Sequence, residues 1–383
     1  MNSALIYLDN AAATPSTPCL LEYFKKESLR SYVNQEAAHQ AASALREELE
    51  AAACEFGKLL SGSSTCGVCW TSSGTEGLCS AVSLPCFAHG NIVSSKVEHP
   101  ALEEALRRVA GNSRTELRYV RIRADGQIDL DHFSSLLDEK TTLVALHHVQ
   151  AETGALQDLL ALRRAIDRSA PNAQFLADTM QSAGKMPLPW ESARLDFAFV
   201  AGRKMGGPPL GAILFRDDPR GTKREFFAAR RKRDHLSSRP DPASVLTLCE
   251  SLRQAESAIV SRSTAVLRMN AFLRDRLQSL SGFGGHRILP TLPADLSSPY
   301  ILHFSVDACQ GAVLVRLLGE KGIALGAGSA CAAESNKPSA ALQAMGWRKE
   351  DAYSGLRASF WEELTEQKLE TFMERLREAL ELY

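Results

Sequence analysis

Short apolar runs alternate with longer amphipathic segments along most of the 383-residue chain. Apolar runs this short are typical of strands that are buried on both faces. Strands separated by helices favour a mainly parallel sheet covered by helices on both sides, and ligands of such sheets bind at the carboxyl ends of the strands. The expected strands are 67–71, 91–95, 117–121, 142–147, 174–177, 196–200 and 211–215, and an amphipathic helix is expected over 42–60.

The pattern changes after Pro242. A long helical stretch runs from about Ala243 to Leu280 and is followed by a strand at 300–304 and by terminal helices. We therefore expect the main domain boundary at this change.

The charge balance of the chain limits the classes of partner. It has 44 lysines and arginines against 45 aspartates and glutamates, so no global field attracts nucleic acid or acidic membranes. The basic run Arg230–Arg233 is typical of a solvated loop, and we expect no direct nucleic-acid binding. The N-terminus lacks a basic start before a long apolar region, and no stretch approaches the roughly 18 apolar residues of a membrane span. We expect a cytoplasmic protein that contacts no membrane.

Nine cysteines are scattered along the chain without a paired framework, which is typical of reduced thiols. The one Cys-x-x-Cys, Cys66–Cys69, has no second pair or nearby histidine and leads into an apolar strand. Strand packing explains it better than a metal ion does, and we expect no metal site.

Two strand ends carry residues of opposite charge. Lys204 follows the strand at 196–200 within a glycine-rich turn, and Asp178 follows the strand at 174–177. A carboxylate beside a pyridine nitrogen keeps that nitrogen protonated, and a lysine can bind an aldehyde covalently and then move protons. The pair suggests a site for pyridoxal phosphate (PLP), with a solvated strand end as the alternative explanation for Lys204.

Two further features follow strand ends. Gly74 and Thr75 lie where a strand turns into a helix, and this place suits a phosphate because backbone N–H groups and the positive end of the helix meet there. An ordinary capped helix start, with Glu76 in its first turn, explains the same residues equally well. His99 follows the strand at 91–95 and is placed to lie on a pyridine ring, whereas a lone histidine is more often a surface or core residue.

Two residues near the C-terminus suit an amino-acid substrate. Cys331 lies among glycine, serine and alanine, where a thiolate can reach into a cofactor site and swing out again; the alternative is a buried structural thiol. Arg357 lies in a short apolar stretch, and its guanidinium suits bidentate binding of a carboxylate or a surface ion pair.

These residues belong to motifs that run in one order through nearly the whole chain. The chain resembles the NifS-like cysteine desulfurases, which are PLP enzymes of the class V aminotransferase type. The motifs that carry the resemblance are Tyr7–Pro15, Thr71–Glu76, Glu98–His99, His148–Gly154, Asp178–Lys185, Gly202–Lys204 and Gly328–Cys331.

The resemblance implies an α/β fold of PLP fold type I. A large, mainly parallel sheet domain flanked by helices would span residues 16–245. A smaller α/β domain, made of 1–15 and 246–383, would carry the cysteine segment. The resemblance also implies a homodimer and a protein that accepts the sulfur.

The same resemblance assigns roles to the residues. Lys204 would hold PLP covalently, Asp178 would pair with the pyridine nitrogen, and Gln181 would hydrogen-bond the ring hydroxyl. His99 would stack on the ring and assist proton transfer. Cys331 would attack the sulfur of L-cysteine, which leaves a protein persulfide and releases L-alanine.

Five residues complete the implied site. Gly74, Thr75 and Arg203 would bind the cofactor phosphate. Arg357 and Asn34 would bind the cysteine substrate.

The chain departs from the family pattern close to the cofactor. Ala201 and Arg203 stand where the family has serine and histidine, and Ala151 replaces an asparagine that usually contacts the cofactor. Arginine still binds phosphate. Pro240 stands where a threonine normally reaches the phosphate of the neighbouring subunit, so the sharing of an active site across a dimer is open.

Three functions stay open on the sequence. A cysteine desulfurase predicts alanine release that disappears in Cys331→Ala. A divergent PLP-dependent lyase or transferase for another amino acid, favoured by Ala151, Ala201 and Arg203, predicts turnover that is indifferent to Cys331. A non-catalytic relative that binds a partner predicts no turnover, and the retention of dispersed polar groups at strand ends argues against it.

Overall fold

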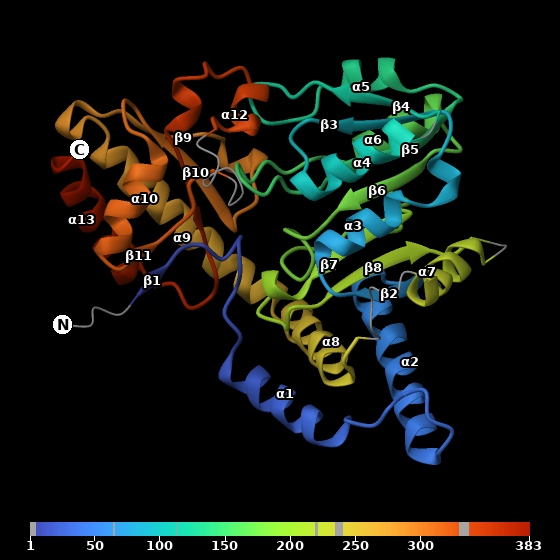
Figure 1. Ribbon diagram of the computed structural model, residues 1–383. Coiled ribbons are helices and arrows are strands. Elements are labelled where there is room, and N and C mark those ends of the chain that lie inside the picture. Colours follow the sequence, from blue (N-terminus) through green and yellow to red (C-terminus); the bar gives the residue numbers. More distant parts are fainter. Residues whose placement is uncertain (1–4, 64–65, 113, 219–220, 234–239, 329–336) are drawn as a thin grey trace.

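The computed structural model describes residues 5–63, 66–112, 114–218, 221–233, 240–328 and 337–383, with only the backbone described at 230–233. The largest sheet has seven strands. Figure 1 shows helices packed around this sheet and a second, smaller group of strands and helices beside it. The first described strand, Ile6–Tyr7, and the last helix, Glu366–Glu381, both lie in the smaller group (Figure 1).

The seven-stranded sheet has the order β2-β8-β7-β6-β5-β3-β4. Its inner strands β3, β5, β6 and β7 run parallel, as does β4 at one edge, whereas β8 is antiparallel to both β7 and β2. The expectation of a mainly parallel α/β sheet is confirmed. Its strands are β2 (Cys66–Thr71), β3 (Asn91–Ser95), β4 (Glu116–Val120), β5 (Thr141–His147), β6 (Gln174–Asp178), β7 (Phe197–Ala201) and β8 (Gly211–Arg216).

Helices cover both faces of this sheet. In β5, Leu143 and Ala145 face one apolar cluster, and Val144 and Leu146 face the other, as the two-residue period of a strand requires. Side chains buried on both faces explain why the strands appear as continuous apolar runs in the sequence. The helices of this part are α1 (Pro18–Arg30), α2 (Gln40–Ser61), α3 (Gly74–Val82), α4 (Pro100–Asn112), α5 (Leu130–Leu136), α6 (Leu159–Ser169), α7 (Thr222–Arg233) and α8 (Pro242–Ser257).

The smaller part contains a three-stranded antiparallel sheet in the order β12-β10-β9 and a parallel pair, β1 with β11. The pair joins the first strand of the chain to a strand more than 300 residues later, Ile6 to Ile323. The elements are β1 (Ile6–Tyr7), α9 (Ile259–Leu280), β9 (Ile288–Pro290), β10 (Ile301–Val306), α10 (Gly311–Glu320), β11 (Ile323–Ala324), α12 (Ala340–Ala344), β12 (Gly355–Ser359) and α13 (Glu366–Glu381).

The long helical stretch expected over 243–280 is present, but it is interrupted at one residue. The structure forms two helices, α8 and α9, because Ala258 leaves the helical conformation with φ −99° and ψ 2°. Helix α8 packs against α1 and α2, whereas α9 packs against β9, β10 and α13, so the chain changes partners at this residue. The division into 16–245 and 1–15 with 246–383 stays a prediction. Within the described ranges, every helix is too short or too polar to span a lipid bilayer.

Candidate active site

A cavity of about 690 Å³ opens at the carboxyl ends of the central parallel strands. Four of the residues singled out in the sequence, His99, Asp178, Gln181 and Lys204, line it together. His99 follows β3, Asp178 ends β6, and Lys204 follows β7 by one turn. This is the edge at which parallel sheets bind their ligands.

Two glycines shape the turn that carries Lys204. A Cβ on Gly202 would lie 2.2 Å from the carbonyl oxygen of Pro208, and Gly206 has a φ of +75° with the carbonyl of Pro15 close by. The N-terminal segment also holds this turn, because Oγ1 of Thr14 donates a hydrogen bond to the carbonyl of Lys204 at 3.2 Å. The backbone around the lysine is therefore held at several points.

The amine of Lys204 lies in a partly buried, cationic environment. Burial and the nearby guanidinium of Arg357 lower its pKa to about 8, and the carboxylates of Asp178 and Asp9 only partly oppose this effect. The Nζ atom donates a hydrogen bond to the carbonyl oxygen of Ala11. A lysine with such a pKa has a sizeable uncharged fraction near neutral pH, the form that attacks an aldehyde.

Asp178 is a buried carboxylate that faces the cavity. Burial raises its pKa, although the backbone N–H of Met180, 3.0 Å from Oδ1, and the imidazole of His99 pull in the opposite direction. A buried carboxylate with a raised pKa lacks a strong cationic partner. Such a group suits a ligand that brings a protonated nitrogen.

Glu98 and His147 form a buried ion pair beside Asp178 that the sequence does not reveal. Oε1 of Glu98 lies 2.9 Å from Nδ1 of His147 and accepts a hydrogen bond from Ser95 at 2.6 Å. Burial alone lowers the pKa of His147, but the adjacent Glu98 carboxylate outweighs it and the pKa is raised. The sequence feature that could have pointed to this ion pair is the pair of adjacent histidines, His147 and His148, at the end of an apolar strand.

A hydrogen bond to the His99 ring identifies which of its nitrogens carries the hydrogen. Its Nδ1 accepts a hydrogen bond from the N–H of Ala101 at 3.2 Å, so the neutral ring carries its hydrogen on Nε2. Burial lowers the pKa of His99, and the Lys204 cation adds to this, against the opposing carboxylates of Asp178 and Glu98. The ring therefore favours its neutral form.

The start of α3 is both a capped helix start and a turn with N–H groups that can bind an anion. Ser73 caps the helix by accepting from the N–H of Glu76 at 3.2 Å, and the Glu76 carboxylate accepts from the N–H of Ser72 at 2.6 Å. In the described part of the chain, the N–H groups of Gly74 and Thr75 have no hydrogen-bond partner and stay available to an anion.

The two residues of this turn differ in position. A Cβ on Gly74 would lie 2.5 Å from the side chain of Met180, which lines the cavity, so Gly74 borders the cavity wall. Thr75 is exposed and lines a separate hollow of about 630 Å³ between α3 and α4.

Arg357 is buried behind the cavity and already has partners. Its guanidinium donates to the carboxylate of Asp9 at 2.6 Å and to the carbonyl of Ala151 at 2.9 Å, and its Nε has no partner among the described residues. A Cβ on Gly326 would lie 2.9 Å from this guanidinium, so the glycine leaves room for it. Asp9 is 348 residues away from Arg357 in the sequence, so this pairing was not predictable from the sequence.

Two other predicted residues, both described, do not line the cavity, and a third cannot be placed. Arg203 is exposed beside Lys204, and Asn34 is exposed between α1 and α2, where its Oδ1 accepts from the N–H of Glu36 at 2.9 Å. Cys331 lies outside the described residues. The roles of all three stay predictions.

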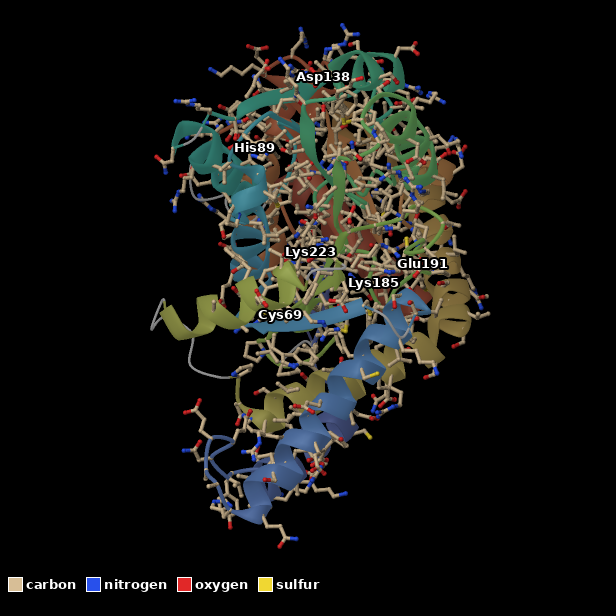
Figure 2. The ribbon with its side chains drawn as sticks, turned by 90° about the vertical axis from the view of Figure 1, so that its right-hand side faces the viewer. Cys69, His89, Asp138, Lys185, Glu191 and Lys223 are labelled. Atoms are coloured by element: carbon tan, nitrogen blue, oxygen red, sulfur yellow. The ribbon has the colours of Figure 1, made fainter. Side chains whose placement is uncertain are left out.

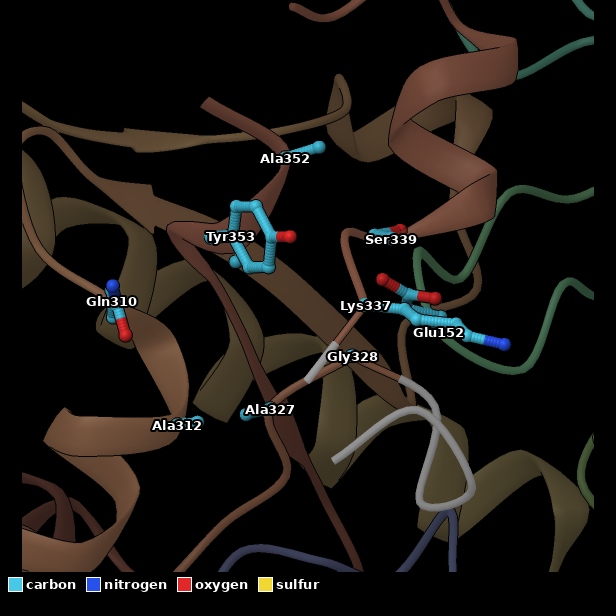
Figure 3. Close-up of a pocket in the computed structure, with 10 residues that line it drawn as sticks. Glu152, Gln310, Ala312, Ala327, Gly328, Lys337, Ser339, Ala352 and Tyr353 are labelled. Atoms are coloured by element: carbon cyan, nitrogen blue, oxygen red, sulfur yellow. The ribbon is translucent and has the colours of Figure 1, made fainter. Parts of the chain in front are cut away.

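A second hollow adjoins the cavity and is shown in Figure 3. Glu152 and Lys337 line both, and Ser339 and Gly328 line the second. Burial raises the pKa of the Glu152 carboxyl, against a hydrogen bond from Ser339 and the charge of Arg357. Glu152 thus connects the two spaces.

The residues of the cavity fit PLP. Asp178 offers a buried carboxylate without a strong cationic partner, Lys204 offers an amine of lowered pKa, and the start of α3 offers free N–H groups to a phosphate. These are the three groups that the pyridine nitrogen, the aldehyde and the phosphate of the cofactor require.

Comparison with known proteins agrees with this reading of the cavity. A family model for Aminotransferase class-V matches residues 6–231, more than half of the chain. A protein named cysteine desulfurase IscS from Anaeromyxobacter sp. (strain K) is 29% identical over 98% of this chain and 94% of its own. A cysteine desulfurase from Nostoc sp. is 25% identical over 99% of this chain and 93% of its own.

The fold comparison points the same way. The solved structure of a NifS-like protein superposes with a TM-score of 0.85 at 21% identity and covers 99% of this chain and 100% of its own. The chain belongs to the aminotransferase class-V family, and its fold is that of the NifS-like proteins.

Proposed function

We propose that the protein is a PLP-dependent cysteine desulfurase that converts L-cysteine to L-alanine and holds the sulfur as a persulfide on Cys331. The observation that carries the proposal is the convergence of Lys204, Asp178 and His99 on one cavity. Full-length similarity to proteins named cysteine desulfurase supports the choice of substrate.

The described residues divide the work of holding the cofactor. Asp178 would keep the ring nitrogen protonated, Gln181 would contact the ring oxygen, and the N–H groups of Gly74 and Thr75 would bind the phosphate. Bound PLP supplies an electron sink at the substrate's α-carbon. Lys204 would bind the cofactor covalently and, once released, would carry a proton to and from that carbon.

Arg357 would bind the carboxylate of the substrate. Its guanidinium is held by Asp9, so an incoming carboxylate has to share or replace this partner. The cysteine Cβ–S bond then breaks and an S–S bond to Cys331 forms. The thiol proton ends on the former Cβ, which becomes the methyl group of alanine, so that atoms and electrons balance without an external oxidant.

The cavity also has a feature that favours a different amino acid as substrate. The side chain of Ala151 has no amide group. The side-chain amide oxygen of Gln150 already accepts hydrogen bonds from the backbone N–H groups of Glu152 and Thr153, each at 2.7 Å. The second candidate function is therefore a PLP-dependent lyase or transferase that does not use Cys331.

The finer properties of the proposal follow from the resemblance. We propose a cytoplasmic homodimer that passes its sulfur to an acceptor protein. The absence of a strong net charge agrees with recognition of that acceptor through a local surface.

Alanine release from L-cysteine tests the proposal. The PLP-loaded protein is expected to release alanine, and Cys331→Ala is expected to lose this activity, whereas Cys54→Ala, which removes an exposed thiol on α2, is expected to retain it. Turnover that persists in Cys331→Ala would favour the second candidate. Cofactor binding without alanine formation would reject the desulfurase.

A further inference from the structure

Lys185 is a buried lysine for which the proposed reaction has no use. Its side chain is almost fully covered, with a residue exposure of 2%, and it lies within the body of the molecule in Figure 2. Two aromatic rings surround the amine, that of Tyr300 at 5.8 Å and that of Trp361 at 6.0 Å. Burial is costly for an amine, and it lowers the pKa of Lys185 to about 7.

The side-chain hydrogen bond of Lys185 goes to Gln181. Its Nζ donates to Oε1 of Gln181 at 3.3 Å, and within the described ranges the charged groups that act on it are the cations Lys204, Arg357 and Arg262 rather than a carboxylate. Both residues lie in the turn that follows Asp178, four positions apart. Gly184, with a φ of +67°, lies in the same turn and packs against Ala255 of α8.

The amide of Gln181 can adopt one orientation between its neighbours. In its ammonium form Lys185 only donates, and its Nζ faces the amide oxygen. On the other side the carbonyl of Ala11 only accepts, so it has to face the amide nitrogen, and Nε2 donates to it at 2.8 Å. The two neighbours therefore specify the same orientation independently.

The carbonyl of Ala11 also connects this arrangement to the catalytic lysine. It accepts hydrogen bonds from both Gln181 Nε2 and Lys204 Nζ. Its own position is fixed from the smaller part of the molecule, because the N–H of Ala11 donates to Oγ of Ser359 at 2.8 Å. Gln181 and Lys204 are thus linked through one backbone acceptor.

We propose that Lys185 is a positioning residue that holds the Gln181 amide with its N–H side toward the cofactor ring oxygen. The proposal rests on the cofactor of the proposed function but not on cysteine as the substrate. The Gln181 N–H would stabilise negative charge on that oxygen and so make the oxygen's proton easier to remove. Lys185 therefore favours release of this proton at lower pH.

The test is a pH titration of the cofactor's visible absorbance in protein loaded with PLP, without substrate. In Lys185→Met the Gln181 amide keeps its bond to the Ala11 carbonyl but loses the other of its two orienting neighbours, and we expect the pH midpoint to rise by up to about one unit. Lys223→Met is the matched control, because Lys223 is also buried and faces a ring, that of Phe197 at 4.7 Å. Its midpoint is expected to equal that of the wild type.

An unchanged midpoint in a Lys185→Met protein that binds PLP would overturn the proposal. The titration needs no turnover, so its failure is separate from failure of the desulfurase assay.

A second measurement uses cofactor-free protein and applies if Lys185→Met alone does not fold. Gln181→Met leaves the amine of Lys185 buried without its acceptor, whereas the double variant Lys185→Met/Gln181→Met removes both polar groups. We expect the double variant to unfold at a higher urea concentration than Gln181→Met. A double variant that is no more stable than Gln181→Met, or that also fails to fold, would overturn the pairing.

Discussion

The amine of Lys204 is surrounded by charges of both signs, and their balance decides how readily it reacts. Burial is the main cause of its lowered pKa and Arg357 lowers the pKa further, whereas Asp178 and Asp9 raise it. These charges come from segments that are far apart in the sequence. The reactivity of this lysine is therefore a property of the folded cavity rather than of its local motif.

The pH dependence of cofactor uptake follows from this balance. Only the unprotonated amine attacks the aldehyde of PLP, so the uptake rate of cofactor-free protein is expected to rise through pH about 8 and then level off. In Arg357→Leu a positive neighbour is gone, the pKa of Lys204 rises, and the midpoint is expected at higher pH. Stopped-flow absorbance measures both profiles.

A matched control is Arg348→Leu, which removes an exposed arginine that pairs with Asp351 on the surface. Its uptake profile is expected to match that of the wild type. A midpoint for Arg357→Leu at or below the wild-type value would contradict the electrostatic origin of the lowered pKa.

Single residues at strand ends were predictable, but their partners were not. Asp178, His99 and Lys204 each follow an apolar run, and parallel strands bring such positions to one edge. The Glu98–His147 pair depends on β3 and β5 being neighbours, which the order of strands in the sequence does not specify. The Asp9–Arg357 pair joins the two ends of the chain.

At the scale of elements, the turn into α3 packs against the start of the neighbouring strand β8. A Cβ on Gly211 would lie 2.5 Å from the carbonyl carbon of Ser73 and 2.6 Å from its oxygen. The glycine at the start of β8 therefore lets the backbone of the turn approach the sheet. The position of the free N–H groups of Gly74 and Thr75 depends on this contact.

Gly211→Ala is expected to displace this turn without touching the cofactor. We expect the dissociation constant for PLP to rise about tenfold, equivalent to about 1.4 kcal/mol, and the free energy of unfolding to fall by about 1–3 kcal/mol. Fluorescence titration and urea denaturation give the two values.

Gly319→Ala in α10 is the control, because no atom lies within 4 Å of the added Cβ. Alanine is the better helix former, so this variant is expected to be at least as stable as the wild type. Unaltered PLP binding in Gly211→Ala would show that the turn does not depend on β8.

Strands were easier to predict than the break between α8 and α9. The apolar runs have a length and composition that are typical of strands in a covered sheet, and each expected strand is present. The apolar pattern continues through Ala258 without proline or glycine, so nothing local signals the break. It arises because α8 and α9 pack against different parts of the molecule.

At the scale of the whole molecule, the N-terminal segment connects the two sheets around the cavity. Leu8 donates from its N–H to Ala324 at 2.7 Å and accepts from the N–H of Ser359 at 2.7 Å, while the N–H of Thr14 donates to the carbonyl of Arg203 at 2.6 Å. The same short stretch thus contacts the smaller sheet and the turn of Lys204. The motif Tyr7–Pro15 was recognised in the sequence, but its contacts with the smaller sheet and with the turn of Lys204 were not predicted.

The position of the transferred sulfur tests the central claim most directly. PLP-loaded protein receives one equivalent of L-cysteine, its free thiols are alkylated, and its peptides are analysed by mass spectrometry. We predict one additional sulfur atom on the peptide that contains Cys331, together with an equal amount of alanine. Alanine without sulfur on Cys331, sulfur on a different cysteine, or neither product would contradict a desulfurase that works through Cys331.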